Sequence, residues 1–186
     1  MKYFKKLVWD RIYLSPRNSE DVEKFTEWLN DFETIDYLGR SGILTTLDGE
    51  KKYLEQNSSQ EASFVIVTIK DNKMIGTVSL ENINHINRCA TLGIFIGNKE
   101  FRSKGYGTEA IKLISEYGFK YLNLHSIKLD LLSANKRAHK CYLKCGFKDT
   151  GSSREEIYLN GKYYDKLHMD ILENEFEGGC IKNKNI

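Results

Sequence analysis

The first third of the chain predicts one strand followed by helices. Apolar and polar residues alternate over residues 11–15, which is the period-two pattern of a half-buried strand. We expect this strand to stop at Pro16, the only proline of the chain, because proline cannot donate to a strand ladder. Apolar residues at helical spacing behind a serine N-cap predict a helix over residues 19–29. Residues 30–46 indicate a loop or weak helix, and residues 47–56 a second helix.

The middle of the chain changes to a strand pattern. Residues 63–70 and 73–84 are apolar, β-branched runs on either side of an Asp-Asn turn, and they predict an antiparallel hairpin. Residues 90–97, ATLGIFIG, predict a third strand. After residue 107 the apolar residues recur at helical spacing, which predicts a helix of about four turns.

The last third returns to strands around one more helix. Residues 127–133, IKLDLLS, predict a strand, and the segment from Asn135 to Gly146 predicts a helix with an asparagine start and a glycine C-cap. Two further strands, residues 147–159 and 162–173, are joined by an Asn-Gly turn. The predicted order is βααβββαβαββ, which is typical of an α+β or mixed α/β domain.

Length and composition indicate one globular domain. The chain has 186 residues, of which 40% are hydrophobic and 29% charged, within the range of a single domain. We expect this domain to span residues 1–175 and residues 176–186 to form a flexible C-terminal tail, since that segment contains two glycines and lysines without periodic apolar partners. No apolar run approaches the ~18–20 residues of a membrane span. The N-terminus does not resemble a signal peptide, so a cytoplasmic location is expected.

Charge and cysteine content argue against several classes of function. The formal net charge of +2 disfavours a nucleic-acid-binding domain, which usually carries a strongly basic surface. The four cysteines contain no CxxC pair, and we interpret them as reduced, mostly buried thiols rather than as a disulfide framework or a zinc site. No metal site is predicted. A homodimer is one oligomeric state that the sequence leaves open.

The segment RSKGYGTEA, residues 102–110, carries the candidate chemistry. The spacing of Gly105, Gly107 and Ala110 fits a loose dinucleotide-binding pattern, with Asp130 as the ribose-binding acid, but the loop lies too far behind the preceding strand. A Walker loop is excluded because no lysine follows the last glycine. Two interpretations remain: an ordinary tight turn, or backbone N–H groups at a helix N-terminus that receive a phosphate with help from adjacent cations.

Two motifs together resemble the GCN5-related N-acetyltransferase (GNAT) superfamily. The strand LGIFIG and the loop RSKGYGTEAI match its R/Q-x-x-G-x-G/A hallmark. The later segment SANKRAHKCYLKCGF matches N-x-x-A-x-x-x-Y-x-x-x-G-F. The similarity extends from residue 11 to residue 172, and the early stretch WLNDFETIDYLGRSG is similar to the branch of ribosomal-protein N-terminal and spermidine acetyltransferases.

This resemblance implies a GNAT-type fold, with a mixed, mostly antiparallel sheet of about seven strands and about four helices. It implies an enzyme that moves an acetyl group from acetyl-CoA, its co-substrate, to a primary amine by direct attack in a ternary complex. The amine would belong to a protein N-terminus, a polyamine, an amino sugar or an antibiotic. The residues assigned to acetyl-CoA are Ile94, Phe95 and Ile96 through their backbone, Arg102, Lys104, Gly105, Tyr106, Gly107 and Thr108 around the pyrophosphate, and Asn135 beside the cofactor arm.

The resemblance also assigns catalytic roles. Tyr142 matches the family's general acid, which protonates the departing thiolate, although a tyrosine at helical spacing is also typical of a core residue. Backbone N–H groups of residues 94–96 are the expected oxyanion donors. For the general base we favour Glu81, directly or through water, over His85. A solvent-facing role for Glu81 fits the strand pattern equally well.

The sequence does not identify the acceptor amine. Acidic residues and tyrosines lie in the early helices and the last hairpin, which form the acceptor pocket in the GNAT family, and acids there would attract a cation. A solvated charged surface is the alternative. A non-catalytic acyl-CoA-binding or sensing module is the alternative function, and the intact Tyr142 weighs against it. The residues in question are Asp31, Glu33, Asp36, Tyr37, Glu155, Glu156 and Tyr158.

Overall fold

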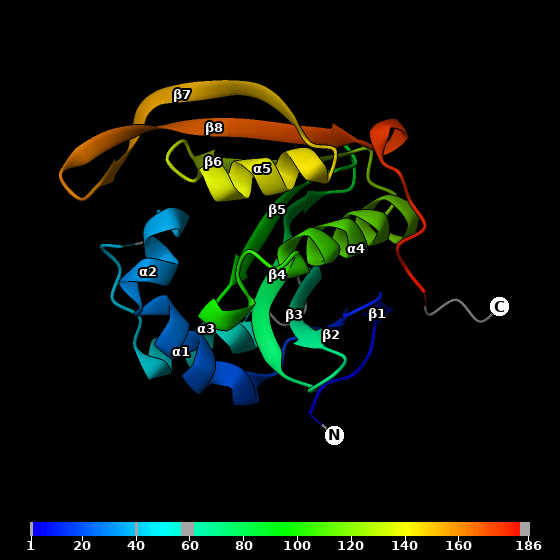
Figure 1. Ribbon diagram of the computed structural model, residues 1–186, viewed down its shortest axis with the longest axis horizontal. Helices are drawn as coiled ribbons and strands as arrows, with labels where there is room; N and C mark the ends of the chain where they lie inside the picture. Colours follow the sequence, from blue (N-terminus) through cyan, green and yellow to red (C-terminus); the bar gives the residue numbers. More distant parts are fainter. Residues whose placement is uncertain (1, 40, 57–61, 183–186) are drawn as a thin grey trace.

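The strands form one eight-stranded sheet in the order β1-β2-β3-β4-β5-β6-β8-β7 (Figure 1). The computed structural model describes residues 2–39, 41–56 and 62–182. Each neighbouring pair is antiparallel except β5 and β6, which are parallel. The predicted strands are all present, and the short β1 is the additional one. The bounds are β1 (Leu7–Val8), β2 (Ile12–Pro16), β3 (Ala62–Thr68), β4 (Met74–Asn84), β5 (Cys89–Ile96), β6 (Ser126–Leu132), β7 (Lys148–Leu159) and β8 (Lys162–Leu172).

The helices follow the predicted order, with one addition. The stretch predicted as a loop or weak helix contains the one-turn α2 and a 3-10 turn at Asp36–Leu38. The N-cap predicted at Ser19 is wrong by one residue, because the side chain of Asn18 accepts the N–H of Glu20 at the start of the first helical turn. Within the described residues, no helix is both long and apolar enough to cross a bilayer. The α-helices are α1 (Val22–Leu29), α2 (Phe32–Ile35), α3 (Leu47–Gln56), α4 (Tyr106–Tyr121) and α5 (Lys136–Lys144).

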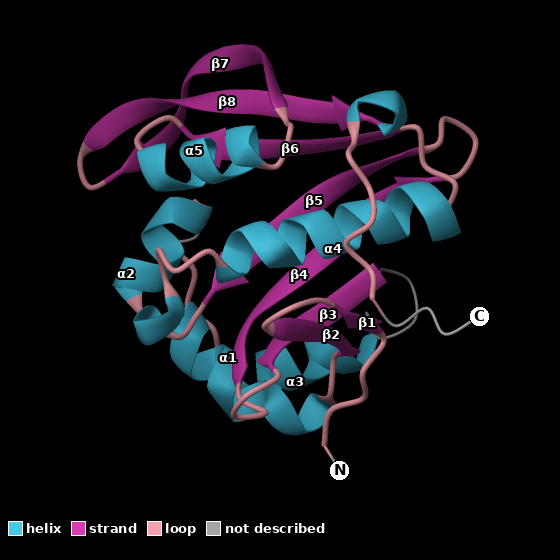
Figure 2. Cartoon of the chain, turned by 45° about the vertical axis from the view of Figure 1, so that its right-hand side comes forward, coloured by secondary structure: helices cyan, strands magenta, loops and turns pink. Residues whose placement is uncertain are grey.

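Two buried clusters lie on opposite faces of the sheet. Ile12 and Leu14 belong to the larger cluster and Tyr13 to the smaller, as the alternation of side chains along a strand requires. The larger cluster packs α4 against the sheet, and the smaller packs α1 and α3 against the other face. Figure 2 shows α4 across the front of β4 and β5, with α1 and α3 at the lower end. Each fully buried aliphatic side chain contributes about 1.5–3 kcal/mol to these contacts.

The parallel pair β5 and β6 stays together over a short length only. Its register runs from Cys89 opposite Ser126 to Thr91 opposite Lys128 and then stops. Beyond that point β5 continues beside β4, and β6 continues beside β8. Residues 92–96 of β5 therefore present one row of backbone N–H and C=O groups that β6 does not pair, and such groups need other partners when they are shielded from water.

A buried glutamate holds the C-terminal segment on α4. Glu116 Oε2 accepts the backbone N–H of Cys180 at 2.5 Å and of Ile181 at 3.0 Å, and its Oε1 accepts Lys120 Nζ at 2.7 Å. The side chains of Cys180 and Ile181 are buried. Residues 180–182 of the expected tail are therefore held against the domain, where the N–H of Lys182 also donates to the carbonyl oxygen of Val8 at 2.9 Å. Residues 183–186 lie outside the described residues.

Glu116→Gln should destabilise the protein. Loss of the charge weakens two backbone hydrogen bonds and leaves Lys120 without its partner, so we expect the free energy of unfolding to fall by about 2–3 kcal/mol in urea titrations. Burial raises the pKa of Glu116, but the hydrogen bonds from Lys120 and from the backbone of residues 179–181 outweigh burial and hold this pKa below its ordinary value. The carboxylate is thus ionised at neutral pH.

The sign of the pH dependence follows from the lowered pKa. A group of this kind stabilises the fold fully above its unfolded pKa, which is ordinarily 4.5 for glutamate, and the contribution is lost as the pH falls through the folded value. The difference in the free energy of unfolding between wild type and Glu116→Gln should therefore become smaller only in that acidic range. Glu23→Gln, at an exposed position of α1, is the control. A Glu116→Gln protein as stable as wild type at neutral pH would contradict the assignment.

Candidate active site

A cavity of about 840 Å³ lies where β5 and β6 diverge. Its lining includes residues 92–96 of β5 and residues 130–132 of β6. We call the part bordered by the segment 101–111 and by residues 135–144 the loop half. The part bordered by residues 33–39, Asp130, residues 156–158 and Lys166 is the hairpin half. One continuous cavity thus connects the start of α4 with the β7–β8 hairpin.

The glycine loop directs the start of α4 toward the cavity. Gly105 is the N-cap of α4 with a φ of 86°, a left-handed conformation that favours glycine. Gly107 lies in the first turn, and no atom lies within 4 Å of the position that a Cβ would take there. Both residues line the cavity. The unpaired N–H groups of the first helical turn and the helix dipole are therefore accessible to an anion, as phosphate binding requires.

Arg11 fixes this loop from the side of β2. Its Nη1 donates to the carbonyl oxygen of Lys104 at 3.0 Å, and its Nε pairs with Glu109 Oε1 at 2.5 Å. The guanidinium also lies 4.5 Å from the centre of the Tyr106 ring. Arg11 was not predicted from the sequence, because its partners lie 93 and 98 residues away along the chain.

Arg102 lines the cavity, but its side chain is engaged with protein groups. Its Nε donates to the carbonyl oxygen of Ile96 at 2.9 Å, and its Nη2 donates to Thr34 Oγ1 at 2.7 Å. Its Nη1 pairs with Glu33 Oε1 at 3.0 Å, and only 9% of the side chain is exposed. Arg102 therefore ties the end of β5 to α2. Its contact with a pyrophosphate stays a prediction that would require some of these bonds to be exchanged.

Besides Arg102, the cations that line the loop half come from α5. Lys104 and Tyr106, both predicted at the pyrophosphate, are not part of the lining. The α5 cations of the lining are Arg137, Lys140 and Lys144. Their spacing of three and four residues places them on one helical face, and this spacing is the sequence signal that could have identified them.

The other predicted acetyl-CoA residues are brought together here. Asn135 caps α5, since its Oδ1 accepts the N–H of Ala138 at 3.1 Å, which confirms the predicted cap. Thr108 lies in the first turn of α4, where its Oγ1 is 3.3 Å from Cys141 Sγ. Contacts of these residues with acetyl-CoA stay predictions. The predicted residues that line the cavity are Ile94, Phe95, Ile96, Arg102, Gly105, Gly107, Thr108, Asn135 and Tyr142.

Tyr142 is buried and lines the cavity. Its ring packs against Phe147, with 5.9 Å between the ring centres, and none of the described residues hydrogen-bonds its hydroxyl. Burial raises the pKa of Tyr142, so the hydroxyl keeps its proton at neutral pH. A buried core tyrosine usually satisfies its hydroxyl within the protein. A protonated hydroxyl without a protein partner at a cavity wall is better suited to donating that proton to a bound molecule.

The two predicted bases are not part of the lining. Glu81 Oε1 accepts Ser79 Oγ at 2.7 Å and lies 3.1 Å from the position that a Cβ on Gly93 would take. Gly93 does line the cavity, so Glu81 lies beside a residue of the cavity wall. His85 lies in the turn between β4 and β5, next to the exposed Ile86, and the structure does not bring it to the site.

Carboxylates gather in the hairpin half. Glu33 pairs with Lys99 at 2.8 Å as well as with Arg102, and Glu156 pairs with Lys166. The hydrogen bond from Lys99 lowers the pKa of Glu33, and the hydrogen bond from Lys166 lowers the pKa of Glu156. Both are therefore ionised at neutral pH. Of the predicted acceptor residues, Glu33, Tyr37, Glu156 and Tyr158 line the cavity, whereas Asp31, Asp36 and Glu155 do not.

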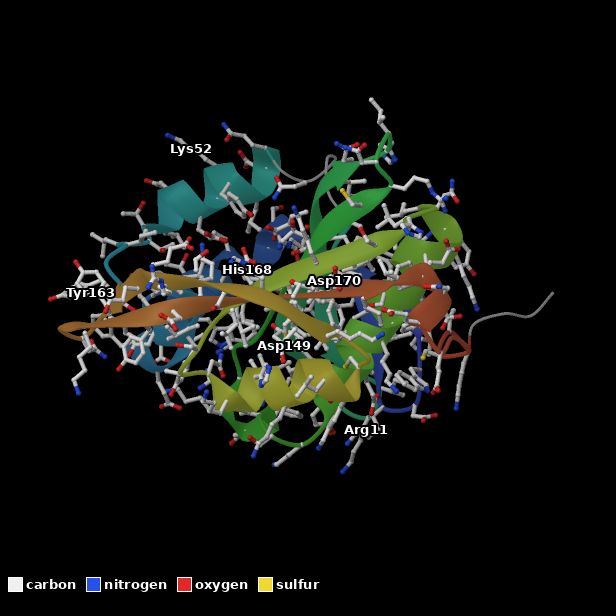
Figure 3. The ribbon with its side chains drawn as sticks, turned by 90° about the horizontal axis from the view of Figure 1, so that it is seen from above. Arg11, Lys52, Asp149, Tyr163, His168 and Asp170 are labelled. Atoms are coloured by element: carbon white, nitrogen blue, oxygen red, sulfur yellow. The ribbon has the colours of Figure 1, made fainter. Side chains whose placement is uncertain are left out.

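Asp130 is a further carboxylate of the hairpin half. It lies on β6 at the divergence and was interpreted from the sequence only as a possible ribose-binding acid. His168 Nδ1 lies 2.7 Å from Asp130 Oδ1, and His168 Nε2 lies 2.9 Å from Ser153 Oγ. Figure 3 shows His168 midway along β8, which runs between β6 and β7. In the described part of the chain, no group of three or more His, Cys, Asp or Glu side chains could hold a metal ion.

Comparisons with known proteins agree with this geometry. The family model described as "Acetyltransferase (GNAT) domain" matches residues 11–148. A spermidine N(1)-acetyltransferase of Escherichia coli strain K12 is 34% identical over 168 residues, which cover 89% of this chain and 88% of that protein. A putative ribosomal N-acetyltransferase of Bacillus subtilis is 28% identical over 70% of this chain and 68% of its own. The crystal structure of spermidine N-acetyltransferase from Vibrio cholerae in complex with CoA and spermine superimposes with a TM-score of 0.81 and 28% identity, covering 88% of this chain and 96% of that one.

Gly107→Val should weaken acetyl-CoA binding without unfolding the protein. The space around a Cβ at this position is free of protein atoms, so the branched side chain fits the fold but projects into the volume that a phosphate would occupy. We expect the dissociation constant measured by calorimetry to rise at least about tenfold, a loss of about 1.4 kcal/mol. Gly107→Ala is the matched control and should have a smaller effect. Unchanged affinity in Gly107→Val, at an unchanged melting temperature, would mean that the loop is only a turn.

Proposed function

The chain belongs to the acetyltransferase (GNAT) family and is an acetyl-CoA-dependent N-acetyltransferase, and we propose that its acceptor amine is a polyamine such as spermidine. Two independent observations support this proposal. The relatives named for spermidine acetylation match almost the whole chain. Independently, the half of the cavity opposite the glycine loop is acidic.

The acidity of the hairpin half is the observation that carries the proposal. Glu33, Asp130 and Glu156 line it, and a polyamine is an extended chain with a positive charge at each protonated nitrogen. Glu33 and Glu156 are already paired with cationic side chains. Asp130 has no lysine or arginine partner among the described residues, and its only ionisable partner there is His168. We therefore assign Asp130 as the main carboxylate for a protonated nitrogen of the acceptor.

The continuous cavity favours direct transfer in a ternary complex. Acetyl-CoA would lie in the loop half, with its pyrophosphate at the α4 N-terminus and its arm along residues 94–96. A neutral amine in the hairpin half would then attack the thioester carbonyl. The free backbone N–H groups of residues 94–96 are the proposed donors to the developing oxyanion.

Proton transfers complete the proposed reaction. The attacking nitrogen must lose a proton, and Glu81 is the proposed base, acting through a water at Gly93. The departing thiolate must gain one, and Tyr142 is the proposed donor. Because Tyr142 has no other hydrogen-bond partner among the described residues, its proton is available for this step. A non-catalytic acyl-CoA sensor would have no need for this hydroxyl.

Asp130→Asn should weaken acceptor binding selectively. Release of the CoA thiol is followed with acetyl-CoA and spermidine, and with a peptide that has a free N-terminus as the competing acceptor. We expect wild type to prefer spermidine, and the variant to raise KM for spermidine about tenfold to a hundredfold, because a charge-assisted hydrogen bond contributes about 1.5–3 kcal/mol. The KM for acetyl-CoA should not change.

Asp149→Asn is the matched control for this prediction. Asp149 lies on β7 and contacts His139 at 2.8 Å, outside the cavity lining, so its removal should leave both KM values unchanged. The polyamine assignment would be overturned if the peptide were the better substrate. Equal KM values for spermidine in wild type and Asp130→Asn would show that Asp130 does not bind the acceptor.

Tyr142→Phe should lower kcat by about 10²–10⁴-fold, as expected for loss of a general acid, and should leave the melting temperature and the affinity for acetyl-CoA unchanged. No intramolecular hydrogen bond of the hydroxyl is lost, and the ring still packs on Phe147. Tyr121→Phe, at an exposed tyrosine of α4, serves as control and should keep full activity. A decrease in kcat below tenfold would show that Tyr142 only positions the sulfur.

A further inference from the structure

A histidine lies behind Asp130, the carboxylate assigned above to the acceptor amine. His168 is directly opposite Asp130 in the register of β6 and β8, and its Nδ1 lies 2.7 Å from Asp130 Oδ1. Asp130 Oδ2 has no hydrogen-bond partner among the described residues, so it is available to a ligand. Asp130 lines the cavity, whereas His168 does not. His168 can therefore influence a bound amine through Asp130 rather than by contact.

The two hydrogen bonds of the imidazole define its protonation. An ionised carboxylate only accepts hydrogen bonds, so Nδ1 carries a proton and donates it to Asp130. In the neutral ring Nε2 is then an acceptor, and Ser153 Oγ, at 2.9 Å, donates to it. When Nε2 gains a proton, the same hydroxyl can turn and accept, because serine does both. The contacts of His168 therefore suit both of its protonation states.

The two protonation states affect Asp130 in different ways. Neutral His168 holds the carboxylate through one N–H group and leaves its negative charge uncompensated. Protonated His168 places a positive charge in direct contact with Asp130 and so weakens the attraction of that carboxylate for a cation. Glu156, which also lines the cavity, lies within range of the same charge. Histidine is the side chain that ordinarily changes its charge between about pH 5 and 8.

The other charged groups near His168 are of both signs. They come from β8 itself and from β6 and β7, the two strands that pair with it, on the face that His168 shares with Asp130. Among the described residues, Asp130 is the ionisable group in direct contact with His168. The charged groups on this face are Lys128 and Asp130 of β6, Lys148 and Glu156 of β7, and Lys166 and Asp170 of β8.

We propose that His168 is a positioning residue of the acceptor site: as a neutral imidazole it orients Asp130 for the polyamine, and as an imidazolium it offsets the charge of Asp130. The proposal rests on the assignment of Asp130 to the acceptor amine. It gives polyamine binding a pH dependence of definite sign. Affinity is highest while His168 is neutral and falls as the pH is lowered and His168 gains a proton. Binding of acetyl-CoA in the loop half should not follow this change.

The test is calorimetric binding of spermidine to the full-length protein saturated with CoA, which lacks the acetyl group, so that no transfer occurs. The dissociation constant is compared at about pH 7.5 and about pH 5.5, on either side of the ordinary histidine range. Amines of this kind stay largely protonated at both values, so the charge of the ligand does not account for a change. For wild type we expect the dissociation constant to be about threefold to fivefold higher at the lower pH.

Two substitutions of His168 separate its hydrogen bond from its charge. Asparagine has an amide N–H near the place of Nδ1 but does not titrate in this range. His168→Asn should therefore bind spermidine as wild type does at about pH 7.5 and should lose the pH response. His168→Leu has no donor for Asp130, so its dissociation constant at this pH should be about twofold to tenfold higher. Melting temperatures establish that both variants are folded.

Two further variants serve as controls. Asp130→Asn should also lose the pH response, because it leaves no charge for His168 to offset. His139 is a second histidine in contact with an aspartate, Asp149 at 2.8 Å, and neither residue lines the cavity. His139→Asn should therefore keep both the affinity and the pH response of wild type.

The acceptor preference of wild type is measured first. If the peptide with a free N-terminus is the better acceptor, the polyamine assignment and this proposal are both overturned. If spermidine is the better acceptor, three results overturn this proposal alone. They are a wild-type dissociation constant that does not rise at the lower pH, a pH response that persists in His168→Asn, and a folded His168→Leu protein that binds spermidine as tightly as wild type.

Discussion

The early end of the pairing between β5 and β6 is the constraint on which the rest of the structure depends. A parallel pair that stops at Thr91 and Lys128 leaves one row of backbone groups of residues 92–96, the row on the side of β6, without strand partners, and buried groups of this kind must be satisfied by something else. In this protein Arg102 Nε donates a hydrogen bond to the carbonyl oxygen of Ile96, the last residue of β5. The remaining groups face a cavity that extends from the α4 N-terminus to the β7–β8 hairpin. We therefore expect the proposed substrates to bind the backbone groups of β5 that β6 leaves unpaired.

Charged side chains contribute to this site mainly by holding its walls in place. Arg11 fixes the glycine loop through Lys104 and Glu109, and Arg102 ties β5 to α2. The affinity of the loop for an anion then rests on helix N–H groups made accessible by Gly105 and Gly107, with the α5 cations nearby. In the hairpin half the distribution is opposite, because carboxylates line it. The cavity thus has one half suited to phosphates and one suited to cations.

Features of the fold and site that depend on local sequence pattern could be predicted from the sequence. Periodicity predicted the order of strands and helices, and the two motifs identified the glycine loop, Asn135 and Tyr142. Partners that are distant in sequence were not predictable, because no local pattern indicates that Arg102 turns toward Thr34 or that Glu116 holds residues 180 and 181. The importance of Asp130 likewise depends on where β5 and β6 separate. That point is fixed by tertiary packing rather than by the alternation of IKLDLLS.

The central claim is that both substrates occupy one cavity across the divergence of β5 and β6, so that the acetyl group passes directly from sulfur to nitrogen. Initial rates of CoA release, measured over a matrix of acetyl-CoA and spermidine concentrations, test it most directly. A ternary complex predicts double-reciprocal lines that intersect. Parallel lines, the pattern of a covalent acetyl-enzyme intermediate, would contradict the account.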